Sequence, residues 1–300
     1  MQAEGAVTAV PFPIPRNLRE SIEEDEDPER EEWLRRLPGT IAELTERWEL
    51  RLDPPFEPGG TISWVAPASD RDGEARVLKV SWAGPETLHE AEGLREWDGD
   101  GTALLYRAER FDHTSAMLLE HCRPGTPLAR LRAEPERDEI VAGLLRNLWR
   151  HPADGHPFRP LHVMCDQWAD EFEEDYEPGD LDPGLARAGT ALFRELPRSA
   201  PASVLLCTDL HAENILAGDR RPWLVIDPKP YLGDPHYDPL QHMLNCPGRL
   251  IADPIGFTDR MAGLLDLDRE RLRAWLFARC VQEGIWRPEL GVVAARIAPA

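Results

Sequence analysis

The most informative part of the chain consists of two segments, LLCTDLHAENIL (residues 205–216) and WLVIDP (residues 223–228). In each segment a short apolar run predicts a strand, and polar residues follow at or near its end. Three oxygen-bearing side chains, Asp209, Asn214 and Asp227, are therefore delivered to one region. We expect them to lie near one another because neighbouring strands carry them.

The spacing of these residues is typical of phosphoryl transfer. Asp209 and Asn214 follow the Asp-x-x-x-x-Asn spacing of a kinase catalytic loop, and Asp227 comes one strand-turn-strand later. In that chemistry a carboxylate accepts or orients the proton of the attacking hydroxyl, while an amide and a second carboxylate hold Mg²⁺ on the phosphates. Magnesium prefers hard oxygen ligands, so His211 is expected to orient the loop rather than to bind the metal.

The motif TDLHxxNIL, followed by WLVIDPKP and GDP, resembles the aminoglycoside phosphotransferase family. More narrowly, it is similar to the branch that contains streptomycin 6-kinases and hydroxyurea phosphotransferases, from about Trp33 to near the C-terminus. The resemblance implies a protein-kinase-like fold, with Asp209 as the catalytic base and with Asn214 and Asp227 as Mg²⁺ ligands.

Two features depart from the patterns of related kinases. Cys207 and Thr208 stand where many members of the wider family have His-Gly before the catalytic aspartate. Pro228 follows Asp227 in place of the Phe-Gly of protein kinases, and this rigid residue argues against an activation-loop switch.

Lysine is scarce in this chain: of 34 basic residues, only Lys79 and Lys229 are lysines. A lysine that is kept against such a bias can supply a compact ammonium charge that arginine cannot; for Lys229 alone, accident suffices as an explanation. Lys79 lies in a predicted strand, where the resemblance calls for a phosphate-gripping lysine and a glutamate partner from the next helix. The candidates are Glu86, Glu90, Glu92 and Glu96. Glu90 shares the apolar stripe of that helix, whereas Glu92 points roughly opposite, so we take Glu90 as the partner.

Gly59 and Gly60 precede another predicted strand and are candidates for the loop over ATP, with backbone N–H groups facing the phosphates. An ordinary hairpin turn is the alternative. Asp234 and Asp238 are expected to be structural, Asp238 as the N-cap of a helix, with bracing of the catalytic loop as a further role.

The stretch 166–182 carries nine carboxylates in seventeen residues. Since members of the resembled family often bind cationic aminoglycosides through acidic residues of the helical lobe, this stretch could line an acceptor site. A solvated helix face is the alternative, because charge runs usually have that meaning.

The order of predicted elements indicates an α+β, bilobal protein-kinase-like fold, with a small β-rich N-terminal lobe and a larger helical C-terminal lobe. We expect residues 1–27 to form a flexible lead-in, 28–121 the nucleotide-binding lobe, and 122–300 the helical lobe with the catalytic loop and acceptor site. A first helix is expected from Pro28, and Pro38-Gly39 is a possible site of a break or kink in it. Further strands are predicted at 59–65, 75–80 and 116–120, and helices at 86–97, 135–149, 162–175, 183–196, 239–245 and 268–286.

The composition restricts the partners. A net charge of −21 argues against nucleic-acid binding, which needs a basic footprint. It fits long-range attraction of a cationic ligand, or simply an acidic proteome. No apolar run has membrane-spanning length, no secretory signal is recognisable, and the five scattered cysteines suit reduced thiols, so a cytoplasmic protein without a membrane partner is expected.

Together these features predict an ATP- and Mg²⁺-dependent O-phosphotransferase for a small-molecule hydroxyl, with streptomycin-like, cationic aminoglycosides as the leading acceptors. We expect a monomer or weak dimer. One alternative keeps the chemistry but changes the acceptor to hydroxyurea, an amino sugar or another metabolite. Another is a catalytically silent, kinase-like binding module, against which the complete set of expected site residues argues.

Overall fold

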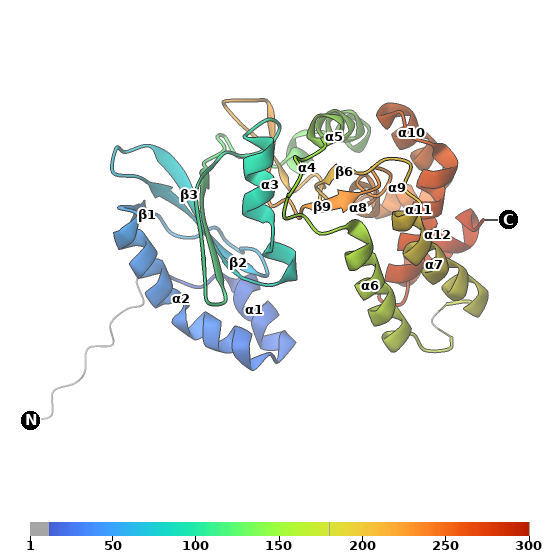
Figure 1. Cartoon of the computed structure of the whole chain (residues 1–300), viewed down its shortest axis with the longest axis horizontal. Helices are drawn as coiled ribbons and strands as arrows, with labels where there is room; N and C mark the ends of the chain where they lie inside the picture. Colours follow the sequence, from blue (N-terminus) through green and yellow to red (C-terminus); the bar gives the residue numbers. More distant parts are fainter. Residues whose placement is uncertain (1–11, 180, 300) are drawn as a thin grey trace, which may run out of the picture. The chain divides into compact units, whose positions relative to one another are not determined.

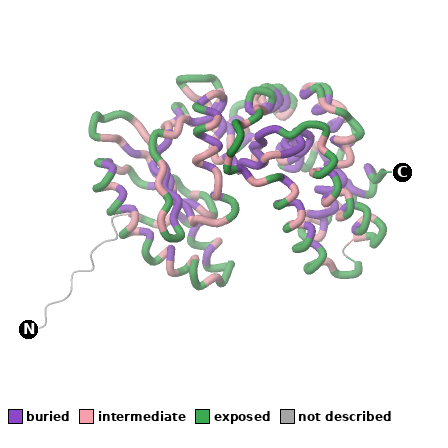
Figure 2. The backbone as a smooth tube through the Cα atoms, in the orientation of Figure 1, coloured by how far each residue is buried: buried purple, intermediate pink, exposed green. Residues whose placement is uncertain are grey.

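A computed structural model describes residues 12–179 and 181–299 of the chain. The chain forms two compact units, one that extends to Ala91 and includes Ala103–His121, and one that combines Glu92–Thr102 with the residues from Cys122 onwards. Each unit has its own buried core, which Figure 2 shows as purple stretches of backbone. Among the described residues, no helix combines the length and apolarity that crossing a membrane requires.

The first unit is built on a five-stranded antiparallel sheet with the strand order β1-β2-β3-β5-β4 (Figure 1). Its strands are β1 (Arg51–Leu52), β2 (Ser63–Ser69), β3 (Ala75–Trp82), β4 (Leu105–Phe111) and β5 (Thr114–Glu120). The central strand β3 pairs with β2 through Val65↔Lys79 and with β5 through Lys79↔Met117. Lys79 therefore lies in the middle of the sheet.

Two helices, α1 (Arg16–Asp25) and α2 (Pro28–Arg47), pack on one face of this sheet. That face carries even-numbered residues of the central strands, such as Trp64, Leu78 and Val80, which share a core with the two helices. Because side chains alternate along a strand, the odd-numbered residues, Lys79 among them, point to the opposite face. The short η1 (Pro85–Thr87) and the helix α3 (Glu90–Trp97) follow β3.

The prediction of a flexible lead-in over residues 1–27 is wrong for α1; residues 1–11 of that segment lie outside the described residues. Leu18 and Ile22 are four residues apart and fully buried, so they anchor one side of an otherwise polar helix in the core of the sheet. The expected break at Pro38 is also absent, and α2 is continuous. Leu37 and Ile41, fully buried on either side of the proline, hold the helix against the sheet.

The second unit is mostly helical and surrounds two small antiparallel sheets, β6 (Val204–Leu206) with β9 (Tyr231–Gly233), and β7 (Ile215–Ala217) with β8 (Trp223–Val225). Its helices include the short α4 (Leu128–Leu131) and α8 (Leu240–Leu244). The longer ones are α5 (Glu134–Leu148), α6 (Leu161–Asp175), α7 (Pro183–Glu195), α9 (Pro247–Ala252), α10 (Pro254–Leu265), α11 (Arg269–Glu283) and α12 (Pro288–Ile297). The turn η2 (Leu196–Arg198) follows α7.

Several of these elements are not among those predicted from the sequence. The helices α9, α10 and α12 each begin with a proline at the first helical position, a signal that could have found them. The strand β4 escaped prediction because it is an edge strand whose exposed polar residues obscure the alternation. The strands β7 and β9, of three residues each, are too short to show a period.

Candidate active site

The two small sheets of the second unit position the predicted catalytic residues. Asp209 follows β6, Asn214 directly precedes β7, and Asp227 follows β8. A backbone hydrogen bond from Ile226 N to Asn214 O, 2.9 Å long, extends the β7–β8 pairing by one step. It places Asn214 and Asp227 beside each other at the end of this hairpin.

Asn214 also contacts Asp209 directly. Its Nδ2 donates to the backbone oxygen of Asp209 at 3.1 Å and to Oδ2 of the same residue at 3.4 Å. Because the amide nitrogen is used in this way, the amide oxygen of Asn214 is the atom left for a metal. With the carboxylate of Asp227 it offers the hard oxygen donors that Mg²⁺ prefers.

Within the described residues, no cluster of three or more His, Cys, Asp or Glu side chains could hold a metal. A pair of oxygen donors fits Mg²⁺, which usually keeps waters and takes further oxygens from phosphates.

The backbone on both sides of the site adopts the left-handed conformation, with φ of 53° at Thr208 and 54° at Asp227. For residues with a side chain this costs about 1–2 kcal/mol each and persists only where the surroundings enforce it. At Thr208 the enforcing contacts are clear: its N–H donates to Asp238 Oδ1 at 2.7 Å, and its Oγ1 donates to the backbone oxygen of Lys229 at 2.5 Å.

Asp238 holds the backbone just before Asp209 in place. Its fully buried carboxylate accepts hydrogen bonds from Thr208 N, from Cys207 N at 3.2 Å and from Trp149 Nε1 at 2.9 Å. Burial raises the pKa of Asp238 from 3.8 to about 6, against these hydrogen bonds, which act to lower it. The prediction that Asp238 caps the next helix is wrong, because α8 starts after Pro239 and no side chain caps it. Instead, the carboxylate accepts from two backbone N–H groups of the loop and from the indole N–H of Trp149.

Asp234 is a structural hub, as predicted. Its fully buried carboxylate accepts from His236 Nδ1, from Arg271 Nε at 2.6 Å and from Trp275 Nε1 at 2.7 Å. Burial acts to raise the pKa of Asp234, but the hydrogen bonds from His236 and Trp275 outweigh it and hold the pKa below the usual value. These bonds tie the segment after β9 to α11.

His211 does not bond to Asp209. Its Nε2 lies 4.0 Å from Asp209 Oδ1, which is beyond hydrogen-bonding distance. Burial lowers the pKa of His211 from its ordinary value and outweighs the attraction of Asp209, which acts to raise it. The residue supports the loop through its backbone oxygen, which accepts from Asn214 N at 2.9 Å.

In the first unit, Lys79 pairs with Glu90. The Nζ of Lys79 donates to both carboxylate oxygens of Glu90, at 2.7 and 2.8 Å, and the two side chains are only 6% and 2% exposed. Glu92 instead faces Arg95 at the surface, at 3.4 Å. The predicted choice of Glu90 over Glu92 is confirmed.

Gly59 and Gly60 lie in the connection between β1 and β2, next to the sheet that carries Lys79. Gly59 has a φ of +80°, and a Cβ at this position would lie 2.4 Å from Pro15. Its backbone oxygen accepts from Asn17 Nδ2 at 2.9 Å. Glycine is thus required at residue 59 by the fold of the first unit, whatever its role toward a nucleotide. At Gly60 an added Cβ would meet only Ser63 O, 3.9 Å away.

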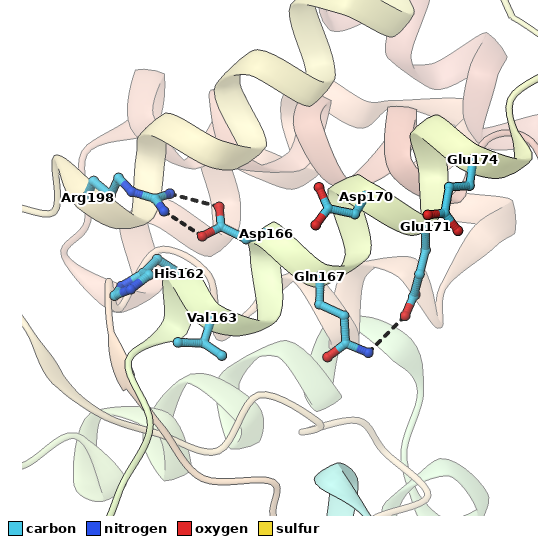
Figure 3. Close-up of a pocket in the computed structure, with 8 residues that line it drawn as sticks. All are labelled: His162, Val163, Asp166, Gln167, Asp170, Glu171, Glu174 and Arg198. Carbon is cyan, nitrogen blue, oxygen red and sulfur yellow. Dashed lines mark hydrogen bonds and ion pairs between the residues drawn. The ribbon is translucent and has the colours of Figure 1, made fainter.

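The acidic stretch lies mostly on α6, where one face lines a pocket of about 490 Å³ (Figure 3). Arg198 forms two hydrogen bonds to Asp166, and Gln167 donates to Glu171 at 2.9 Å. Arg194 bridges Asp170, which also lines the pocket, and Glu173, and Asp182 caps α7. Two arginines thus pair with three carboxylates of the stretch, Asp166, Asp170 and Glu173.

One residue of the site was missed in the sequence. Lys229, for which accident was accepted, places its Nζ 3.0 Å from Asp209 Oδ2. The scarcity of lysine was a signal that could have found it, because each of the two lysines lies against a carboxylate of a predicted site residue.

A strand-rich unit with a buried lysine–glutamate pair, and a helical unit that joins Asp209, Asn214 and Asp227, define a small-molecule phosphotransferase of the protein-kinase type. The chain belongs to the aminoglycoside/hydroxyurea antibiotic resistance kinase family, whose profile matches residues 47–291. The predicted family is thereby confirmed.

Individual relatives agree. The chain is 32% identical over 295 residues to a streptomycin 6-kinase of Streptomyces griseus, covering 96% of this chain and 94% of that protein. It is 37% identical over 268 residues to a hydroxyurea phosphotransferase of Kitasatospora aureofaciens, covering 88% of this chain and 76% of that protein.

Solved structures confirm the α+β, protein-kinase-like fold. An aminoglycoside phosphotransferase in complex with ADP and hygromycin B superposes with a TM-score of 0.59 at 12% identity, covering 86% of this chain and 98% of that one. A choline kinase from Streptococcus pneumoniae gives a TM-score of 0.55 at 13% identity, covering 86% of this chain and 95% of that one.

Proposed function

We propose that this phosphotransferase transfers the γ-phosphoryl group of ATP, in the presence of Mg²⁺, to a hydroxyl group of a streptomycin-like aminoglycoside. The observation that carries the proposal is the contact of Asn214 with Asp209 on one side and its backbone adjacency to Asp227 on the other. This arrangement provides a base and two metal ligands within one short segment.

Each residue has a distinct part. The carboxylate of Asp209 accepts the proton of the acceptor hydroxyl as that oxygen attacks the γ-phosphorus. Asn214 and Asp227 would hold Mg²⁺, which neutralises charge on the phosphate oxygens when bound. Lys79, fixed by Glu90, is suited to grip the phosphates of ATP, and the backbone at Gly59 and Gly60 to cover them.

The choice of nucleotide follows the fold neighbours, of which one was solved with ADP and another with AMP. The choice of acceptor rests on the match to the streptomycin 6-kinase, which extends over nearly the full length of both chains. Hydroxyurea is the second candidate, because the hydroxyurea phosphotransferase has the higher identity over a shorter span. We expect the protein to act in the cytoplasm, where ATP and Mg²⁺ are available, as a monomer or weak dimer.

A screen for ATP turnover tests the proposal. The purified chain is offered streptomycin, other aminoglycosides, hydroxyurea and amino sugars, with and without Mg²⁺. The variant Asp209→Ala should lose about 10²–10⁴-fold in turnover, as expected for removal of a general base. The matched control is Asp219→Ala, which removes an exposed aspartate from the β7–β8 turn.

The possible outcomes separate the alternatives. Unchanged turnover in Asp209→Ala would refute the catalytic assignment. Turnover of a non-antibiotic acceptor alone would remove the aminoglycoside assignment and leave the phosphotransferase. Tight nucleotide binding, measured by calorimetry, without turnover of any acceptor would favour a silent binding module.

A further inference from the structure

Lys229 is held to the catalytic loop through its backbone on both sides. Its N–H donates to Cys207 O at 2.9 Å, and its carbonyl oxygen accepts from Thr208 Oγ1 at 2.5 Å. Pro228 and Pro230 flank it and restrict the backbone further. The starting point of the Lys229 side chain is therefore fixed relative to Asp209.

The side chain ends at the carboxylate of Asp209. Nζ lies 3.0 Å from Asp209 Oδ2, and the two side chains are 26% and 16% exposed. Asn214 Nδ2 approaches the same oxygen at 3.4 Å. Among the described residues no hydrogen bond to the other oxygen, Oδ1, is found, and His211 Nε2 lies 4.0 Å from it. The two oxygens of Asp209 therefore have different surroundings.

A general base needs this asymmetry. The oxygen that takes a proton must face the acceptor with an open lone pair, and the carboxylate must not rotate away. Donors that hold Oδ2 prevent the two oxygens from exchanging places. We propose that Lys229 is a positioning residue, which fixes Asp209 through Oδ2 so that Oδ1 faces the acceptor hydroxyl.

The residue type supports this role. Arginine provides 32 of the 34 basic residues, yet lysine stands at this position. A guanidinium group presents a planar fork that tends to bind both oxygens of a carboxylate, and would cover Oδ1. An ammonium group is a point charge that can hold one oxygen and leave the other open. An ion pair needed only for stability would be served equally well by arginine.

The inference rests on the proposed function, and the conservative variant tests it. In Lys229→Arg we expect the thermal unfolding midpoint to stay close to that of the wild type, while kcat falls by about 10–100-fold, as small misplacements of catalytic groups do. Lys229→Met should lower kcat similarly, with the KM for ATP and acceptor changed much less. The matched control is Arg273→Met, which removes a basic side chain of similar exposure, 27%, on α11.

Two further measurements show whether Lys229 acts through Asp209. In an Asp209→Asn background the additional change Lys229→Met should cost little, because the base that it positions is already gone. In Lys229→Ala, added propylammonium should restore part of kcat, which a general structural defect would not allow.

Each result decides the matter. A Lys229→Arg variant with wild-type kcat would overturn the positioning role and leave the proposed function intact. Additive losses in the double variant would also overturn it. If the wild type transferred phosphate to no acceptor, the proposed function and this inference would fall together. Should Lys229→Met fail to fold, Lys229→Arg, which keeps the charge, carries the test.

Discussion

The ion pair between Lys79 and Glu90 allows stability and activity to be separated by mutation. With exposures of 6% and 2% and both carboxylate oxygens engaged, the pair is almost fully desolvated. In Glu90→Ala the ammonium group loses the carboxylate against which it is buried. Breaking a buried pair on one side costs about 3–5 kcal/mol of unfolding free energy, and we expect a loss of that size.

Glu92→Ala provides the control on the same helix. Glu92 and Arg95 are 40% and 53% exposed and 3.4 Å apart, so their interaction contributes about 0.5 kcal/mol or less. Urea unfolding followed by circular dichroism should therefore give a clearly lower midpoint for Glu90→Ala and an almost unchanged one for Glu92→Ala.

The double variant Lys79→Met/Glu90→Leu completes the experiment. Replacement of a buried ion pair by apolar side chains of similar volume is often neutral or stabilising, so the midpoint should return close to that of the wild type. Phosphate transfer should nevertheless be abolished, because the double variant lacks the ammonium group that we propose to grip the nucleotide. Equal midpoints for Glu90→Ala and Glu92→Ala would refute the energetic reasoning, and an active double variant would refute the role of Lys79.

Three further perturbations test other parts of the structure. The folded-state pKa of Asp238, about 6, lies above its unfolded value of 3.8, so the native state binds this proton more tightly than the unfolded state does. The protonated carboxyl group therefore contributes its full stabilisation below about pH 3.8, and this contribution is lost as the pH rises through 6. Urea unfolding should therefore show the wild type losing about 2 kcal/mol relative to Asp238→Asn between pH 4 and 8, and a constant difference would contradict the assignment. Asp138→Ala should lower the unfolding free energy by about 3–5 kcal/mol in the same assay, because this fully buried carboxylate accepts from one histidine and two arginines, on α8, α9 and α10. A loss below about 1 kcal/mol would show that Asp138 does not hold these three helices together. Gly189→Ala should lower the thermal unfolding midpoint, because the added Cβ would lie 2.4 Å from a valine of α11. Gly39→Ala, where nothing lies within 4 Å of the added Cβ, should raise the midpoint slightly. Equal shifts would argue against the tight packing of α7 on α11.

The candidate site could be found in the sequence to the extent that it is local. Asp209 and Asn214 share one loop, and Asp227 follows one hairpin later, so their proximity depends on short strands that the apolar runs already indicate. Glu90 could be separated from Glu92 because helical phase is also a local property. Where the role of a residue depended on distant chain segments, the prediction was wrong. Asp238 was taken for a helix cap, since nothing local shows that its carboxylate is claimed by N–H groups some thirty residues earlier.

The sequence by itself determined the class of chemistry and the family, and it indicated most residues of the candidate site, because motif spacing, strand ends and helical phase are properties of consecutive residues. The sequence also shows that lysine is scarce, but it does not show what Lys229 contacts. Only the tertiary structure decided that Lys229 meets the carboxylate of Asp209, that α1 is ordered by burial of Leu18 and Ile22, and that two arginines pair with three carboxylates of α6. These features arise from contacts between residues far apart in the chain, and a contact of that kind has no period or spacing in the sequence by which it could be recognised.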